Sequence, residues 1–301
     1  MKSFLQYLAL KIASSIKKGG VIINNHTQNK NQIRLQIDVL GQYFEFIHHN
    51  ELPKRIKQKK SKPFCLMTFD DGKKINATET AIELERSGVP SVFYLTTDCI
   101  NTQQPHWFDF RNCLEQKLPR QTAHLQTKNL KRLSISEISE KLEKMCIQYN
   151  IQPDCSNPLI APMNWEDVCE LDKKGFTIGA HSTRHAILTN ETNTEAETDI
   201  KNSINDVSRH IGRHCSTFAF PNGNYTMELA DHAIRCGAKT VMTTDPTWVK
   251  HDASLNYLPR IQLYNRYTHG QIQIKIAVAS PGIILKNPNG LGRQYVINHF
   301  K

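Results

Sequence analysis

Short β-rich segments alternate with helical segments along most of this 301-residue chain, and this alternation constrains the fold more than any other feature. Strands that alternate with helices are typical of a parallel α/β fold, built either as an open sheet or as a barrel. The segments that we predict as strands span residues 21–24, 44–47, 64–69, 91–96, 176–180, 217–220, 239–243 and 257–263.

The segments between the strands place apolar residues at helical spacing, and several of them end at a glycine. A glycine directly after a helix accepts the left-handed backbone that closes the last turn. Gly88, Gly175, Gly212 and Gly237 stand at such positions. The predicted helices span residues 32–43, 75–87, 165–174, 195–211 and 227–236.

We divide the chain into a main domain over residues 21–270 and two terminal segments. For residues 1–20 we predict an amphipathic helix, and its packing on the main domain is favoured over contact with an anionic membrane. For residues 271–301 we predict a C-terminal tail, because prolines and glycines gather beyond residue 280. A polar, helix-rich insertion is expected near residues 102–160, with 135–149 as its clearest helix.

Composition limits the environment and the partners of the chain. The formal net charge of +10 suits anionic partners, but no recognition motif for nucleic acid accompanies it, so we expect none to bind. The eight cysteines form no CxxC pair, which favours a reducing compartment. The N-terminal residues lack a cleavage signal, and no run approaches the roughly 20 apolar residues of a membrane span. We therefore expect a cytoplasmic protein, either free or at the inner face of the membrane.

The first chemical signal is the pair Asp70 and Asp71, which directly follows the apolar strand segment 64–69 and precedes Gly72. Two adjacent carboxylates at the end of a buried strand repel each other and lose hydration. Both effects raise their pKa values unless a cation shares the site. An ordinary turn with a helix cap is the alternative explanation for an Asp-Asp-Gly sequence.

The second signal is the pair His181 and His185, which follows the predicted strand 176–180. Histidines four residues apart project to one side of a helical turn or tight loop, a common way to supply two imidazoles to one metal ion. Both signals stand at carboxyl ends of predicted strands, where α/β sheets and barrels assemble their sites. One carboxylate and two histidines are the ligands of an open hydrolytic metal site, and the second carboxylate is left to act as a base.

These residues resemble the polysaccharide deacetylases, the NodB-homology family of carbohydrate esterases. The first family motif, TFDDG, is matched in full at residues 68–72, and the second, H-S/T-x-x-H, is matched in full at 181–185. The third motif, R-x-P-x-G, is matched only in part by AFPNG at 219–223, and a bacterial subgroup with F-A-Y-P-N-G is more similar.

The resemblance implies a distorted (β/α)7-type barrel that binds a divalent ion, Zn²⁺ in the first place and Co²⁺ or Ni²⁺ as alternatives. Its metal ligands would be Asp71, His181 and His185, and Asp70 would be the general base. The backbone N–H of Asn222 would stabilise the oxyanion. We also expect Pro221 and Trp248 to contact the substrate, although a buried tryptophan is an equally common outcome for Trp248.

Two family features are missing. The arginine that steadies the catalytic base is Ala219 here, and we expect Arg260 to take its place; a surface salt bridge is the alternative role of Arg260. The late motif that supplies a general-acid histidine is also absent. His26, at the end of the first strand, is the best candidate for that acid, ahead of His251 and His269.

The expected function is metal-dependent removal of N-acetyl groups from amino sugars of a polysaccharide or a lipid-linked glycan. Two alternatives stay open from the sequence. One is a barrel that binds a glycan without hydrolysing it, which the two missing features favour. The other is a metal-dependent amidohydrolase that acts on a small cyclic or linear amide.

Overall fold

The computed structural model describes residues 19–58 and 62–279. Residues 1–18 of the predicted N-terminal helix and residues 280–301 of the predicted tail lie outside this part of the chain. The helix predicted over 1–20 does not extend to its last two residues, because Gly19 and Gly20 begin the first strand.

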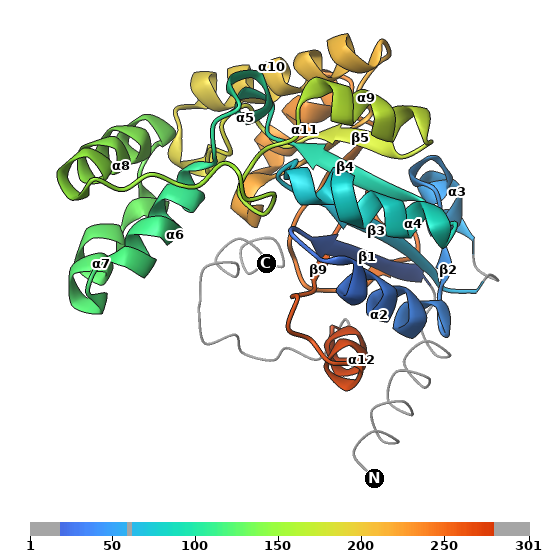
Figure 1. Cartoon of the computed structure of the whole chain (residues 1–301). Helices are drawn as coiled ribbons and strands as arrows, with labels where there is room; N and C mark the ends of the chain where they lie inside the picture. Colours follow the sequence, from blue (N-terminus) through green and yellow to red (C-terminus); the bar gives the residue numbers. More distant parts are fainter. Residues whose placement is uncertain (1–18, 59–61, 280–301) are drawn as a thin grey trace.

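A curled, mainly parallel sheet forms the centre of the molecule (Figure 1). Its strands follow the order β7-β6-β5-β4-β3-β1-β8, with β2 on β3 and β9 on β1. Only β8 runs antiparallel to its neighbour among the described strands. The strands are β1 (Gly19–Asn25), β2 (Glu45–Phe46), β3 (Phe64–Phe69), β4 (Ser91–Leu95), β5 (Thr177–Ala180), β6 (Thr217–Ala219), β7 (Thr240–Met242), β8 (Val249–Lys250) and β9 (Ile261–Gln262).

The two edges of this sheet meet through the segment that leads into β9. Ile261 pairs with Ile23 of β1, and Leu258 forms a parallel bridge with Met242 of β7. The sheet therefore curls into a distorted barrel, and the predicted fold class is confirmed. Every residue of β3 and β4 is buried, as expected for parallel strands that are covered on both faces.

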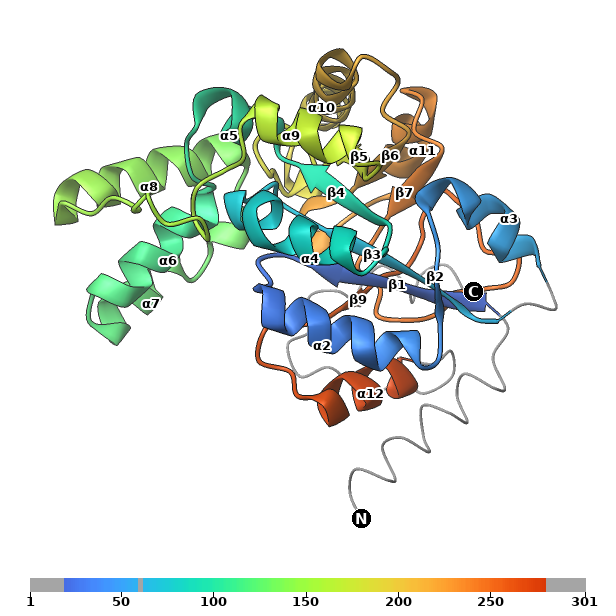
Figure 2. The ribbon, with the colours of Figure 1, turned by 45° about the vertical axis from the view of Figure 1, so that its right-hand side comes forward.

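Helices pack around the outside of the sheet (Figure 2). The described helices are α2 (Lys30–Gly41), α3 (Leu52–Lys57), α4 (Ala81–Arg86), α5 (Thr97–Thr102), α6 (Trp107–Lys117), α7 (Arg120–Thr127), α8 (Ile135–Tyr149), α9 (Trp165–Lys173), α10 (Asn193–Ile211), α11 (Met227–Arg235) and α12 (His269–Val278). None of them is both long and apolar enough to cross a bilayer, within the described residues.

The predicted insertion forms α6, α7 and α8, which project from one side of the barrel in both views (Figures 1 and 2). Its clearest helix, α8, has the bounds that the sequence predicts. The Ser134 side chain caps the first turn by accepting a hydrogen bond from the Glu137 backbone N–H. In turn, the Glu137 carboxylate accepts a hydrogen bond from the Ser134 N–H at 2.8 Å. This capping box explains why α8 begins where it does.

The glycines at the helix ends and the cysteines can be checked directly in the structure. Gly88, Gly175, Gly212 and Gly237 all have positive φ, as expected for helix C-termini. All eight cysteines are free thiols.

The segment predicted as a tail from residue 271 needs a correction, because it begins inside the helix α12. Thr268 and Gln271 form the capping box of α12, and that helix packs against α2. The apolar residues Ile272 and Ile276 are fully buried at this contact.

Candidate active site

The chemical residues predicted from sequence gather in a cleft of about 460 Å³ at the carboxyl ends of the strands. Parallel strands bring their carboxyl ends to one edge, so loops that are distant in sequence meet there. The cleft is lined by Asn24, His26, Asp70, Asp71, Trp107, Phe108, Arg111, Lys131, His181, His185, Phe220, Asn222, Thr244, Gln262 and Tyr264.

The carboxylate pair sits on a sharp turn after β3. Asp70 continues the strand, since its N–H donates to the Asn25 carbonyl at 2.9 Å. Asp71 and Gly72 then have φ angles of 77° and 69°. A left-handed aspartate is uncommon and indicates a backbone held in place by its surroundings. The turn keeps both carboxylates buried, at 2% and 3% exposure.

The two histidines lie on a tight loop after β5. Ser182 and His185 both have positive φ, and the Ser182 hydroxyl accepts a hydrogen bond from the Ala186 N–H at 3.2 Å. The His181 Nδ1–H donates to the carbonyl of Ala219 at 2.7 Å. This bond fixes the tautomer of His181 and leaves Nε2 with a free electron pair that faces Asp71.

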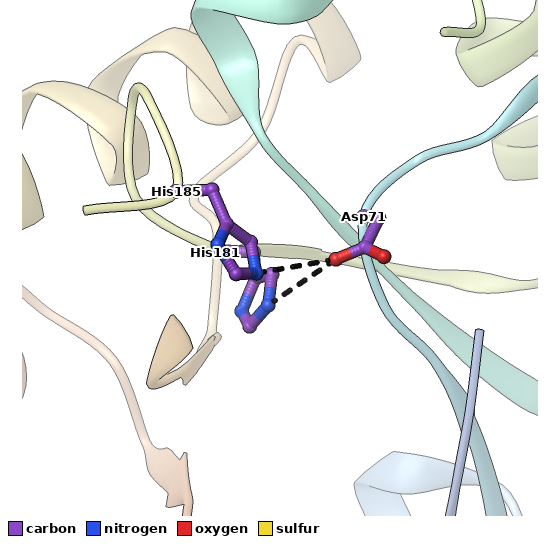
Figure 3. Close-up of side chains that lie close together, drawn as sticks. All are labelled: Asp71, His181 and His185. Atoms are coloured by element: carbon purple, nitrogen blue, oxygen red, sulfur yellow. Dashed lines mark ion pairs between the residues drawn. The ribbon is translucent and has the colours of Figure 1, made fainter. Parts of the chain in front are cut away.

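Asp71, His181 and His185 fit a divalent metal ion. The Asp71 Oδ1 atom lies 3.4 Å from His185 Nε2 and 3.7 Å from His181 Nε2, and all three donor atoms lie within 4.8 Å of one another (Figure 3). Donor atoms at about 2.0 Å from a tetrahedral ion lie roughly 3.3 Å apart. The same Asp71 oxygen is buried without a hydrogen-bond partner, so a cation would satisfy it.

Electrostatics support deprotonated ligands at this site. Burial alone would raise the pKa of Asp71, but the imidazoles of His26, His185 and His106 hold it well below its ordinary value. Burial lowers the pKa of His181 to about 4. At neutral pH the site therefore offers a carboxylate and a neutral imidazole, which are the protonation states that a metal ion needs.

Arg260 forms a bidentate ion pair with Asp70. Its Nη1 and Nη2 donate to the two Asp70 oxygens at 2.7 and 2.9 Å, and its side chain is fully buried. Burial raises the pKa of Asp70, but Arg260 and His181 outweigh it, so the pKa lies below its ordinary value. Arg260 therefore lies in the site, as expected, and not on the surface.

The guanidinium of Arg260 is itself held from three sides. Its Nε donates to the Thr243 carbonyl at 2.9 Å, and Nη1 also donates to the Thr68 hydroxyl at 3.1 Å. The ring of Tyr94 lies beneath it, 5.4 Å from the guanidinium carbon. Tyr94 fits because Gly179 lacks a side chain, since a Cβ there would lie 2.5 Å from the tyrosine ring.

The third motif forms a turn that borders the cleft. Asn222 has a φ of 56°, and its side chain lines the cleft. Gly223 follows with a φ of 77°, and a Cβ there would lie 1.7 Å from the Thr244 hydroxyl. Pro221 is buried in this turn and is not among the residues that line the cleft, so the structure gives no support to the substrate contact predicted for Pro221.

The candidate acids separate clearly by position. His26 lines the cleft and acts electrostatically on both aspartates. His251 bonds to the Lys57 carbonyl and pairs with Asp252, beside β8 at the opposite end of the barrel. His269 is exposed at the start of α12, and neither of these two lines the cleft.

Trp248 likewise lies outside the cleft, in line with the alternative of a buried tryptophan. Its side chain is 2% exposed and packs on Phe44, and its indole N–H donates to the Ile276 carbonyl of α12 at 2.8 Å. Trp107 occupies the cleft instead. Its indole N–H donates to the His185 carbonyl at 3.1 Å, and the neighbouring Phe108 ring lies 5.0 Å from the His185 ring.

Several cleft residues were not predicted from the sequence. Arg111 and Lys131 come from the insertion, and Gln262 and Tyr264 come from the end of β9. The aromatic run at 106–108 is the signal that could have placed the insertion at the site. It stands close to the predicted metal ligands only in the folded chain, because His185 follows it by more than 70 residues.

Solved structures of similar fold include several deacetylases. The deacetylase PplD of Streptococcus pyogenes, solved in complex with acetate, has 13% identity and a TM-score of 0.61 over 85% of this chain and 97% of that chain. IcaB from Ammonifex degensii has 13% identity and a TM-score of 0.55, over 86% and 97% of the two chains. A de-N-acetylase from Aggregatibacter actinomycetemcomitans has 13% identity and a TM-score of 0.57, over 86% and 99%. At these identities the likeness shows a shared fold.

A search among proteins of curated function finds no match to the chain. A family model described as polysaccharide deacetylase matches residues 57–241. This match spans more than half of the chain and includes the Asp70–Asp71 pair and both site histidines. The chain therefore belongs to the polysaccharide deacetylase family.

Proposed function

We propose that this protein is a metal-dependent hydrolase that removes acetyl groups from the N-acetylated amino sugars of a glycan. Family membership supports carbohydrate de-N-acetylation as the activity. The observation that carries the proposal is the convergence of Asp71, His181 and His185 next to an ionised carboxylate, Asp70, in one open cleft.

The ion that we propose is Zn²⁺, with Co²⁺ and Ni²⁺ as alternatives, held by Asp71, His181 and His185. Carboxylate and imidazole donors suit all three ions, and three protein ligands leave a position open. When bound, such an ion lowers the pKa of a water molecule and polarises the amide carbonyl. The hydrogen bond from His181 to the Ala219 carbonyl orients one of its ligands.

Asp70 then acts as the general base toward the attacking water. Its ion pair with Arg260 keeps it deprotonated at neutral pH, and the bidentate geometry fixes the direction of its oxygens. General-base catalysis of this kind contributes about 10²–10⁴-fold to the rate. Arg260 thereby does for Asp70 what the family arginine does where this chain has Ala219, which weighs against a barrel that only binds glycan.

The remaining two steps need a donor to the oxyanion and a proton for the amine. We assign the first to the backbone N–H of Asn222, on the turn that lines the same cleft as the metal ligands. An oxyanion donor of this kind is worth about 3–4 kcal/mol. We assign the second to His26, the cleft imidazole that is not a proposed metal ligand.

The test is acetate release from an N-acetylglucosamine oligosaccharide by chelated protein, before and after addition of Zn²⁺, Co²⁺ or Ni²⁺. We expect release only with an ion, and a loss of about 100-fold or more in the Asp70→Asn variant. A small cyclic amide serves as the parallel substrate and should stay intact. Undiminished release after chelation would contradict the metal dependence, and hydrolysis of the small amide alone would contradict the glycan substrate.

A further inference from the structure

Two cationic side chains of the insertion reach the cleft and are not used by the proposed reaction. Arg111 lies on α6, and Lys131 lies in the short 3-10 turn Leu130–Arg132 that precedes α8. Both line the cleft that contains the Asp71, His181 and His185 cluster. They therefore belong to the wall that a bound substrate would contact.

Arg111 lines the cleft, and contacts with three neighbouring side chains hold its guanidinium. Its guanidinium lies over the Trp107 ring at 5.9 Å and donates to the Asn112 side chain at 2.9 Å. One carboxylate, Glu115, lies 3.6 Å from Arg111 Nε and also accepts a hydrogen bond from Thr127. Arg111 Nε is buried without a hydrogen bond of its own.

Lys131 lines the same cleft. Its ammonium group donates to the Asn222 side chain at 2.6 Å, which brings it next to the turn that we assign to the oxyanion. Among the described residues, no carboxylate forms an ion pair with Lys131. Burial, and after it the like charge of Arg111, lowers the pKa of Lys131.

We propose that Arg111 and Lys131 form an anion-binding subsite, which receives a phosphate or carboxylate group carried by the N-acetylated sugar or by its neighbour in the glycan. This proposal rests on the proposed function, since it places the anion in the cleft of the deacetylation reaction. Both cations line the same cleft, so an anion bound there would gain charge-assisted contacts from both.

The chemistry of the two groups suits this ligand. Arginine presents a planar fork that matches phosphate and carboxylate, and lysine supplies a point charge. The bond from Lys131 to Asn222 ties the subsite to the third-motif turn, so a bound anion would lie near the position that we assign to the oxyanion. Glu115 neutralises only one of the two charges, which leaves this wall of the cleft positive.

The test compares binding of N-acetylglucosamine, its 6-phosphate, N-acetylmuramic acid and inorganic phosphate to the full-length, zinc-loaded protein by calorimetry. We expect the two anionic sugars to bind at least about 10-fold more tightly than the neutral sugar, as for a charge-assisted hydrogen bond. Arg111→Gln and Lys131→Gln should each reduce this preference about 10-fold, and Arg111→Lys should retain part of it. Lys128→Gln is the matched control. Lys128 is exposed, lies between α7 and α8 as Lys131 does, and is outside the cleft.

Equal binding of neutral and anionic sugars would overturn the subsite. So would a preference for anions that both glutamine variants leave intact, because the anion would then bind to the metal ion alone. The two sugars also separate the source of the charge, since a phosphate-specific site prefers the 6-phosphate to the carboxylate of muramic acid. Acetate release from a neutral oligosaccharide without any anion preference would leave the proposed function standing while the subsite fails. Anion preference without acetate release from any sugar would leave the subsite standing while the proposed function fails.

Discussion

The Asp70–Arg260 pair shows how one residue can replace another from a different part of the chain. Residue 219 ends β6 and is fully buried, but its alanine has no charge to offer Asp70. Arg260 comes from the segment before β9 and reaches Asp70 from a buried position. An unpaired buried carboxylate would cost several kcal/mol, so this pair supports folding and, in the proposed reaction, the general base.

We therefore expect Arg260→Ala to lower acetate release at least about 100-fold and to destabilise the protein by roughly 3–5 kcal/mol. A second change, Ala219→Arg in the Arg260→Ala background, should recover part of the activity, because it returns a guanidinium to Asp70 from the family position. Steady-state kinetics and denaturant unfolding measure the two effects.

The control for this exchange is Arg86→Ala, which removes an exposed arginine of α4 and should change neither activity nor stability appreciably. Full activity in Arg260→Ala would show that Asp70 needs no cationic partner. In that case the structural argument for Arg260 would be wrong.

At the scale of elements, the loops after β3, β5 and β6 carry residues of the candidate site, and each contains a left-handed residue. Asp71, His185 and Asn222 all have positive φ without being glycine. Such residues cost about 1 kcal/mol or more each, so the barrel must supply the stability that holds them. The strands are short and buried, and this rigid base allows strained loops at one end.

The turn at Gly223 gives a prediction for this scale. We expect Gly223→Ala to reduce kcat at least about 10-fold, because its Cβ would lie 1.7 Å from the Thr244 hydroxyl and displace Asn222 from its position. Metal content, measured by atomic absorption, should stay at the wild-type level.

Gly88→Ala is the matched variant for that measurement. Gly88 also has a left-handed backbone, with φ of 63°, but a Cβ there would meet nothing within 4 Å. It should lose about 1 kcal/mol of stability and no activity. Equal losses of kcat in both variants would mean that the Gly223 turn has no special role.

At the scale of the whole molecule, buried histidines make the fold sensitive to acid. His49 lies beneath β2 and bonds to the Thr240 hydroxyl at 2.8 Å, far from the cleft. Burial, together with the nearby charges of His48 and Lys239, lowers its pKa from 6.5 to about 4. Above pH 6.5 the ring is neutral in both the folded and the unfolded chain, so it adds no pH dependence there.

As the pH falls from 6.5 toward 4, the unfolded chain takes up a proton that folded His49 does not. The free energy of unfolding therefore decreases with decreasing pH in this window. We expect His49→Gln, which keeps a hydrogen-bonding group, to lose roughly 2–3 kcal/mol less than wild type between about pH 7.5 and about pH 4.5. Urea unfolding at both pH values measures this difference, and identical losses would contradict it.

Much of the barrel could be predicted from the sequence because its strands are buried runs between capped helices. The strand Phe64–Phe69 and the helix Ile135–Tyr149 have the predicted bounds. The strand β8 was missed because two residues carry no recognisable pattern. The helix α12 was missed because its hydrophobic residues do not follow a clear amphipathic spacing in sequence.

The residues of the candidate site also differ in whether the sequence could predict them. The residues of the two full motifs could be predicted because the chemistry itself requires carboxylates and imidazoles at strand ends. The cleft positions of Arg111 and Lys131 could not, because only tertiary packing brings the insertion to the site. Trp248 shows the same limit, since its type suggests sugar stacking while its surroundings place it in the core.

The most direct measurement of the central claim is binding of Co²⁺, followed by its visible absorption, to four full-length proteins. Wild type and Asp70→Asn should each bind one equivalent with the absorption of a low-coordinate site, because Asp70 is paired with Arg260 and is not a ligand. His181→Ala and Asp71→Ala should lose that absorption, because each removes one of the three ligands. Equal Co²⁺ spectra in wild type and His181→Ala, or no binding by wild type, would contradict the metal centre on which the proposed hydrolase depends.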